Sequence, residues 1–218
     1  MRRAAVIASG ALILLATFAS AVGPAAAQGG HKLGGAVLPL APDPRRCKVA
    51  PRSLADVKAL WQAANSDPAA APAPAPDQNA EGTPVDPDTL TAISDTVVQE
   101  LACAANANDG LRDAALSTDA RLSDMLIGIS QDEFENYYTA NPTASQPEDW
   151  TILYALNDVR TLPDGRVAVG PQVIAPGVGQ FQDFMILSRG ADGSWLLDAS
   201  VEGDTNLYPP SNRGVPAQ

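Results

Sequence analysis

The chain is poor in the side chains that bind transition metals and act as nucleophilic catalysts. It has a single histidine, His31, and two cysteines, Cys47 and Cys103. Zinc and related metals bind mainly through imidazole and thiolate, so no such site can be assembled here without several carboxylates. No Ser-His-Asp set and no G-x-S-x-G nucleophile elbow is present either. We therefore expect no metal site and no triad-based hydrolysis.

Glycine-rich cofactor motifs are also missing. Gly177-Val178-Gly179 lacks both the third glycine and the following helix of a dinucleotide-binding loop, so we interpret it as a turn. The run from Asn106 to Gly110 has its glycine one position too early for a calcium-binding loop, and we interpret it as the end of a helix. We expect no bound cofactor.

Positive charge is scarce. The sequence has 14 basic and 25 acidic residues, a net charge of -11. Neither a phosphate backbone nor an anionic lipid surface would attract such a chain. Nucleic acid is therefore excluded as an expected partner. The acidic exterior serves solubility, or alternatively attracts a cationic partner.

The first 27 residues have the pattern of an export signal. Arg2 and Arg3 precede an uncharged, mostly apolar run over 4–19, and three alanines end the segment before Gln28. Because this run of about 16 residues is shorter than the roughly 20 that a spanning helix needs, we expect cleavage after Ala27 and no stable membrane insertion afterwards. An uncleaved anchor is the alternative. The expected location is outside the cytoplasm.

Residues 28–66 form an N-terminal segment that holds one short helix, Ser53 to Ala64. Ser53 and Asp56 have the spacing of a capping box, and the apolar residues that follow fall on one helical face. A helix of about 12 residues is not stable alone. We therefore expect it to dock on the main domain.

Residues 67–85 are rich in proline and alanine and have almost no bulky apolar side chain. Such a composition favours extended, solvated conformers. We interpret this range as a disordered linker. A docking site for a proline-binding partner is the alternative, although the flanking basic residues of such ligands are missing.

Residues 86–203 have the pattern of an α+β domain, followed by a tail over 204–218. A helix is predicted over 88–105, and weaker helical pieces over 111–125 and 131–140. The apolar period then changes to two in four runs, 150–160, 166–174, 180–189 and 194–202. Pro-Asp-Gly at 163–165 and Ala-Asp-Gly at 191–193 indicate hairpin turns, so the sheet is expected to be antiparallel.

Three runs of this domain, 100–119, 158–167 and 190–198, resemble the nuclear transport factor 2-like (SnoaL-like) superfamily in order and spacing. Exported bacterial members are similar in having a cysteine-containing segment, here Cys47 to Leu54, before a Pro/Ala-rich linker. The resemblance implies a cone in which N-terminal helices pack on a curved antiparallel sheet around a pocket, and often a homodimer. Family members include isomerases, dehydratases, cyclases and non-catalytic binding domains, so the fold alone does not name a function.

The two cysteines are expected to form a disulfide, because exported proteins meet oxidising conditions. At about 100° per residue, Cys103 falls roughly 140° from the centre of the apolar stripe of its helix. A bridge to Cys47 would hold the N-terminal segment over that surface. A redox-active or metal-binding cysteine is the alternative, for which no partner motif exists.

Carboxylates and tyrosines remain as candidate acid–base groups. Asp183 shares a strand face with apolar side chains, where desolvation raises a carboxyl pKa, and Tyr154 is the candidate donor. Tyr137, Tyr138 and Phe184 are candidate pocket residues. Each also has a simpler interpretation, a strand-edge carboxylate for Asp183 and plain core packing for the aromatic residues.

The sequence thus favours a non-catalytic exported domain that binds a small apolar ligand or a protein partner. A cofactor-independent isomerase, dehydratase or cyclase, using an Asp and a Tyr in a cavity, is the alternative. A purely structural dimer is the third.

Overall fold

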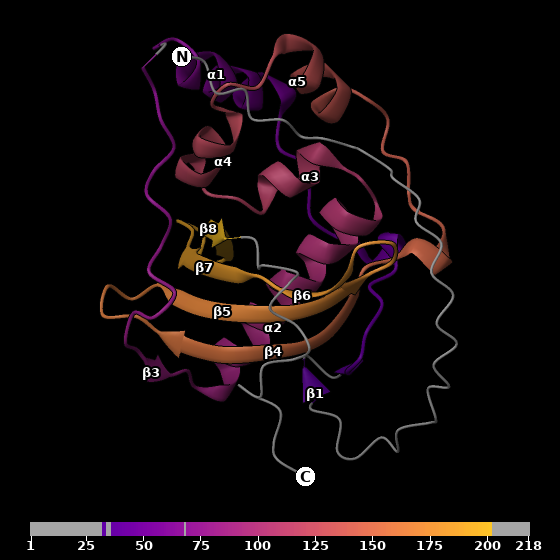
Figure 1. Cartoon of the computed structure of the whole chain (residues 1–218), viewed down its shortest axis with the longest axis vertical. Coiled ribbons are helices and arrows are strands. Elements are labelled where there is room, and N and C mark those ends of the chain that lie inside the picture. The colour runs from indigo at the N-terminus through magenta and orange to yellow at the C-terminus, as the bar shows by residue number, and fades with distance from the viewer. Residues whose placement is uncertain (1–31, 34–35, 68, 202–218) are drawn as a thin grey trace.

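The computed structural model describes residues 32–33, 36–67 and 69–201 (Figure 1). The expected signal at 1–27, the start at Gln28 and the tail at 204–218 lie outside the described residues. The described helices are η1 Pro44–Arg46, α1 Leu54–Ala64, α2 Pro87–Glu100, η2 Leu101–Asn106, α3 Gly110–Ala115, α4 Asp119–Leu126, α5 Gln131–Tyr138 and η3 Pro147–Asp149. The described strands are β1 Lys32–Leu33, β2 Ala36–Val37, β3 Thr83–Pro84, β4 Ile152–Thr161, β5 Val167–Ala175, β6 Gly179–Gln182, β7 Phe184–Arg189 and β8 Trp195–Val201.

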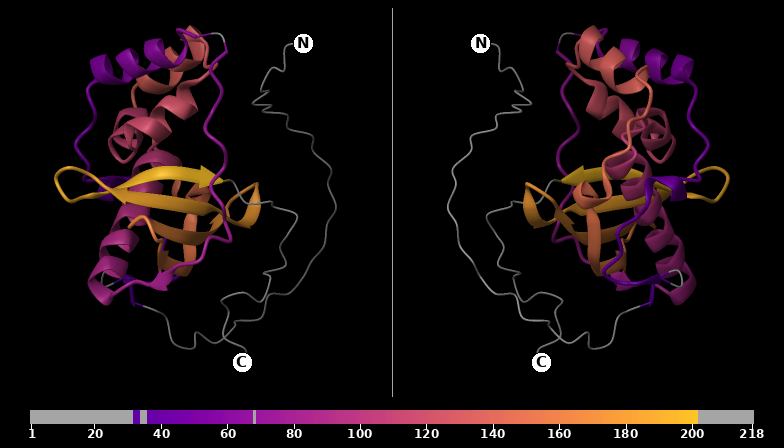
Figure 2. Two further views of the ribbon diagram at one scale, coloured as in Figure 1. Left: turned by 90° about the vertical axis from the view of Figure 1, so that its left-hand side faces the viewer. Right: turned by 90° about the vertical axis from the view of Figure 1, so that its right-hand side faces the viewer.

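The α+β prediction is confirmed. Helices α1 to α5 precede the long strands, and the main sheet of the described chain has the order β3-β4-β5-β7-β8 with every pairing antiparallel. Both expected hairpin turns are present, because Gly165 and Gly193 have φ values of 85° and 84°, which favour glycine. Helices α1, α3, α4 and α5 gather at one end of the sheet, while α2 lies along it (Figure 2).

One predicted strand, 180–189, is divided in two. Both β6 and β7 pair with β5 in one continuous register, and the interruption falls at Asp183, opposite Pro171. Asp183 still donates its N–H to the Pro171 carbonyl at 3.2 Å. Because proline has no N–H to return, the ladder is broken there.

The described apolar interior has three parts. The first lies between α2, η2 and one face of the sheet, where Val97, Val169 and Leu187 are almost fully buried. The second lies among α1, α3, α4 and α5, and the third is a small cluster around Ala168 and Ile186 on the opposite sheet face. Residues of β5 are therefore buried on both sides, which requires cover over both faces of the sheet.

The expected docking of the short N-terminal helix is confirmed. The Ser53 hydroxyl caps α1 by accepting from the Asp56 N–H at 3.1 Å. Val57 is fully buried in the second cluster, and the Trp61 indole N–H donates to the Ile129 carbonyl at 2.9 Å. Packing against α3, α4 and α5 therefore supplies the stability that an isolated helix of this length lacks.

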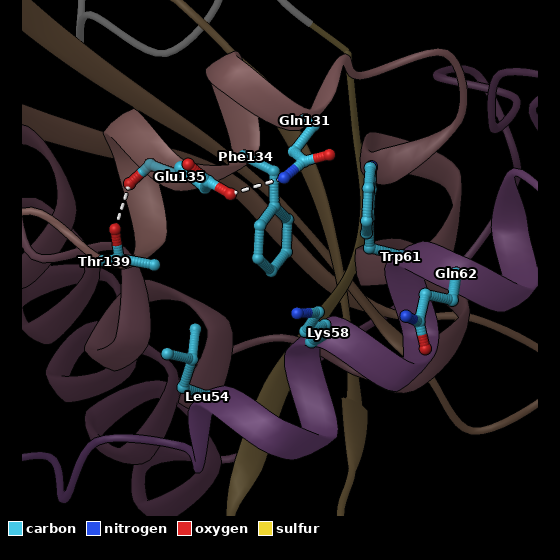
Figure 3. A pocket seen from close by; sticks show the side chains of 8 residues that line it. All are labelled: Leu54, Lys58, Trp61, Gln62, Gln131, Phe134, Glu135 and Thr139. Carbon is cyan, nitrogen blue, oxygen red and sulfur yellow. Dashed lines mark hydrogen bonds between the residues drawn. The ribbon is translucent and has the colours of Figure 1, made fainter.

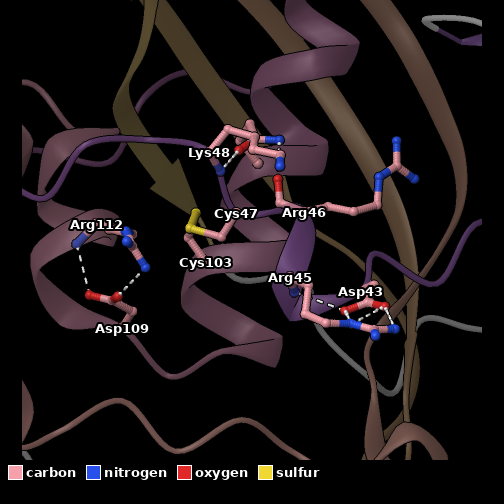
Figure 4. The surroundings of a disulfide bond; sticks show 9 residues. Asp43, Arg45, Arg46, Cys47, Lys48, Cys103, Asp109 and Arg112 are labelled. Carbon is pink, nitrogen blue, oxygen red and sulfur yellow. Dashed lines mark hydrogen bonds and ion pairs between the residues drawn. A yellow bond between two sulfur atoms is a disulfide. The ribbon is translucent and has the colours of Figure 1, made fainter.

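The predicted helix over 88–105 consists of α2 and a π-helical turn, η2. Its Asp86 cap and its proline at the first helical position agree with the sequence pattern. The expected disulfide between Cys47 and Cys103 is present (Figure 4). The Cys103 side chain is fully buried in the first apolar cluster. Gln99 of α2 also holds the N-terminal segment in place. Its side chain accepts from the Lys48 N–H at 2.7 Å and donates to the Arg46 carbonyl at 3.0 Å.

The range 67–85, expected to be a disordered linker, is attached to the sheet at its C-terminal end. Thr83 and Pro84 form β3 on the edge of β4. The Arg160 side chain donates to the Ala80 carbonyl at 3.0 Å and to the Gln78 carbonyl at 2.8 Å. This part of the range therefore differs from the expectation, because long-range hydrogen bonds replace the missing apolar side chains. No helix of the described residues is long and apolar enough to cross a membrane.

Candidate functional site

A groove of about 290 Å³ lies between α1 and α5 (Figure 3). The residues that line it recur every three or four positions along each helix, so each helix contributes one face to the groove. The lining residues are Leu54, Lys58, Trp61 and Gln62 from α1, and Gln131, Phe134, Glu135 and Thr139 from α5 and its end. The volume is at the lower end of small-molecule sites.

The floor of the groove is aromatic and held in place. The rings of Trp61 and Phe134 stack with centroids 4.9 Å apart, and Phe134 also contacts the Tyr138 ring at 5.1 Å. The hydrogen bond from the Trp61 indole to Ile129 fixes the other end of the stack. A rigid aromatic surface of this kind binds an apolar body with little loss of side-chain entropy.

The rim of the groove is polar and carries two charges. Glu135 Oε1 accepts from Gln131 Nε2 at 2.7 Å, along the same helix. Lys58 projects from α1 into the groove, and it makes no hydrogen bond or ion pair with any residue that the structure describes (Figure 3). A ligand in the groove would therefore meet an apolar floor and an unpaired ammonium group.

A second polar site lies in the interior, where α2, α3, α4 and α5 meet. The Tyr137 hydroxyl donates to Asp113 Oδ2 at 3.0 Å, and Arg121 Nη1 donates to Ser117 Oγ at 2.6 Å. Glu100 Oε2 is buried without a hydrogen-bond partner among the described residues, and so is Arg121 Nε. We call Glu100, Asp113, Arg121 and Tyr137 the acid cluster.

The acid cluster changes the protonation of its members. The pKa of Glu100 is raised to about 8, chiefly by burial and also by the nearby Asp113 and Asp183 carboxylates, while Arg121 acts in the opposite direction. Burial also raises the pKa of Asp113, against the lowering effects of Arg121 and of the bond from Tyr137. At neutral pH, Glu100 is therefore mostly a neutral acid within reach of the fields of two carboxylates and one guanidinium.

The predicted site residues are not brought together at one place. Tyr137 belongs to the acid cluster, and Tyr138 packs in the second apolar cluster under the groove. Asp183 is half-buried at the break between β6 and β7, close enough to influence Glu100. Tyr154 is 46% exposed on β4, and β5 lies between that strand and the β6–β7 segment that carries Asp183.

Phe184 lies apart from the two tyrosines. It packs in the third apolar cluster, on the other face of the sheet, with the Arg160 guanidinium 5.7 Å from its ring centroid. Strand alternation explains this placement, since Phe184 and Asp183 are neighbours that point to opposite faces. A single pocket that contains Tyr137, Tyr138 and Phe184 is therefore not formed.

The sequence prediction missed Glu100, Asp113 and Arg121. Glu100 had a detectable signal, because it follows Ile93 and Val97 by seven and three positions and so falls on the buried face of its helix. A carboxylate at such a position needs a partner or a raised pKa. Asp113 and Arg121 gave no comparable signal, since both lie in short helices without a long apolar stripe.

The described residues place no three His, Cys, Asp or Glu side chains together in a way that could hold a metal ion. The acid cluster itself combines two carboxyls with an arginine and a tyrosine, which suits proton transfer or hydrogen bonding better than cation binding. Comparison of the chain with protein-family models, with curated proteins and with solved structures gave no match.

Proposed function

We propose that this protein is an exported, non-catalytic binding module of the nuclear transport factor 2-like type, and that it holds a small amphipathic molecule in the groove between α1 and α5. The observation that carries the proposal is the groove itself, with the stacked Trp61 and Phe134 rings as its floor. Apolar lining with a few polar groups at the rim is typical of ligand sites.

The export and family parts of the proposal have separate support. The disulfide between Cys47 and Cys103 suits an oxidising compartment, in agreement with the signal-like N-terminus. Helices that precede and cover an antiparallel sheet agree with the resemblance of residues 100–198 to the family. A fold of this kind is compatible with many functions, so the proposed binding function depends on the groove and not on the fold.

Binding is favoured over catalysis because the groove lacks an acid–base pair. Its two charged residues, Lys58 and Glu135, stand on opposite walls and do not form an ion pair with each other. Neither is hydrogen-bonded to a hydroxyl or thiol side chain that it could activate. The groove can therefore hold a molecule, but none of its lining residues is an activated nucleophile.

A second candidate function is cofactor-independent proton transfer at the acid cluster. The specific observation in its favour is Glu100, whose pKa of about 8 and unpartnered Oε2 suit a general acid at neutral pH. Tyr137 would serve as a hydrogen-bond donor to a carbonyl substrate. This candidate replaces the Asp183 and Tyr154 pair suggested by the sequence.

Titration with 4-phenylbutanamide, a neutral aromatic probe, followed by ¹H–¹⁵N spectra of the whole chain tests the choice. We expect shift changes concentrated on α1 and α5. Leu54→Ser should weaken binding several-fold, because Leu54 is an apolar part of the groove wall that is 38% exposed and adds little to folding.

Met125→Ser is the matched control, since Met125 is 40% exposed on α4 and outside the groove. It should leave the affinity unchanged. Shift changes centred on Glu100 and Tyr137 would favour the proton-transfer candidate instead, and the absence of saturable binding would refute the groove as a ligand site.

A further inference from the structure

The two charged side chains at the rim of the groove, Glu135 and Lys58, differ in whether they have a hydrogen-bond partner. Glu135 shares a hydrogen bond with Gln131, four residues earlier on the same helix, so its carboxylate lies along α5. Lys58 has no partner of this kind and extends toward the space between the helices (Figure 3). Glu135 keeps its negative charge, and Lys58 is the charged side chain of the groove that has no hydrogen-bond or ion-pair partner among the described residues.

The position of this lysine is notable in such an acidic chain. The sequence has only three lysines, and Lys58 is the one basic residue in α1, while α5 has none. An exposed acidic surface repels anions in general. A lone ammonium beside an aromatic floor gives an anion one place where its charge is compensated.

The polar groups next to Lys58 fit the same interpretation. Gln62, one turn further along α1, lines the groove and carries two amide N–H donors. A carboxylate with two oxygens can accept from an ammonium and an amide at once.

We infer that the groove selects an anion with an apolar body, of the class of aromatic or aliphatic carboxylates. The carboxylate pairs with Lys58, and the apolar body lies over Trp61 and against Leu54. This inference rests on the proposed function, because it names the ligand class of the same groove.

Three probes with one carbon skeleton and different charge test the inference on the whole chain: 4-phenylbutyrate, 4-phenylbutanamide and 4-phenylbutylamine. We expect the carboxylate to bind about threefold more tightly than the amide, as suits an exposed ion pair, and the amine to bind most weakly. Raising the salt concentration should reduce the preference for the carboxylate.

Two substitutions in the groove should act in opposite directions. Lys58→Gln should remove the difference between carboxylate and amide, and Glu135→Gln should strengthen carboxylate binding slightly by removing a like charge. Lys48→Gln is the matched control, because Lys48 is exposed and lies outside the groove. It should keep the preference of the unmodified chain.

The outcomes separate the two proposals. Equal affinity for carboxylate and amide, tightest binding of the amine, or a preference that survives Lys58→Gln would each overturn the anion inference while leaving the groove as a ligand site. Failure of all three probes to bind would overturn the groove proposal and the anion inference together.

Discussion

The surroundings of Glu100 disfavour the charged form of its carboxyl. Its pKa is raised to about 8 first by burial and then by Asp113 and Asp183, with Arg121 acting in the opposite direction. In the unfolded chain the same carboxyl has its ordinary value of 4.5. Folding therefore takes up a proton at Glu100 over the intervening pH range, which makes stability depend on pH.

The sign of this dependence is fixed by the direction of the shift. The contribution of Glu100 is fully present below pH 4.5 and is lost as the pH rises to about 8. Glu100→Gln keeps the shape and removes the titration. We expect the variant to gain stability relative to the unmodified chain by up to about 1.4 kcal/mol per pH unit across this window.

Urea unfolding at a series of pH values between 5 and 9 measures the difference in free energy of unfolding. Asp95→Asn, an exposed acid on the same helix, is the control and should produce no such slope. A difference between the Gln variant and the unmodified chain that stays constant with pH would show that Glu100 is already ionised in the fold.

At the scale of single residues, local chemistry determined what the sequence could predict. The Ser53 cap and the proline at the start of α2 follow from short-range rules, and the disulfide follows from the presence of only two cysteines in a chain with an export-like N-terminus. The structure shows the cap, the proline and the disulfide. The acid cluster depends on which helices meet. Its partners are far apart in sequence, so only the position of Glu100 on an apolar helix face gave a signal.

At the scale of elements, α1 is held to the domain by contacts at both of its ends. Before the helix, the disulfide joins Cys47 to the fully buried Cys103, and the Arg52 N–H donates to the Leu111 carbonyl at 2.9 Å. At its far end, the Asn65 side chain donates to the Leu126 carbonyl at 2.8 Å. Since α1 forms one wall of the groove, these attachments position the site.

Removing the disulfide should loosen this wall. For Cys47→Ala with Cys103→Ala we expect a loss of about 4 kcal/mol in the free energy of unfolding, because the bridge closes a loop with a sequence separation of 56. Urea unfolding measures this loss. In the variant, amide hydrogen exchange should accelerate more in α1 than in β5, since the position of α1 depends directly on the disulfide.

The unmodified chain under reducing conditions is the matched comparison, because it loses the bond and keeps both side chains. It should lose a similar free energy. A loss below about 1 kcal/mol in both cases would mean that packing of Val57 and Trp61 alone holds the helix.

The elements themselves were largely predictable from periodicity and turn residues. The four apolar runs after residue 150 correspond to β4, β5, the pair β6 and β7, and β8. The division at Asp183 was not predictable, because its cause is the partner residue Pro171 on another strand. Local patterns indicate strands, whereas their interruptions depend on register.

At the scale of the whole molecule, the chain passes from the helical end to the opposite face of the sheet between α1 and α2. Figure 2 shows this segment descending along the side of the sheet away from α2. Composition predicted disorder there, since proline and alanine supply little apolar area. The carbonyls of Gln78 and Ala80 nevertheless bond to Arg160, a contact across about 80 positions that composition cannot reveal.

Arg160 is therefore expected to control how firmly this segment covers the third apolar cluster. Its planar guanidinium reaches the two carbonyls from two different nitrogens, Nε and Nη2, whereas the ammonium of lysine would have to meet both from one nitrogen. For Arg160→Lys we expect cleavage by proteinase K within 69–82 to accelerate on the order of tenfold, because local opening becomes easier by roughly the strength of one charged hydrogen bond.

Arg45→Lys is the control, since Arg45 is exposed and, within the described part of the chain, forms its ion pair with Asp43 two residues away. It should leave the cleavage rate unchanged. If Arg160→Lys also left it unchanged, the pairing of β3 with β4 would be sufficient to hold the segment, and the sheet face would not depend on the arginine. An accelerated rate would instead show that one buried side chain keeps a proline-rich segment folded against the domain.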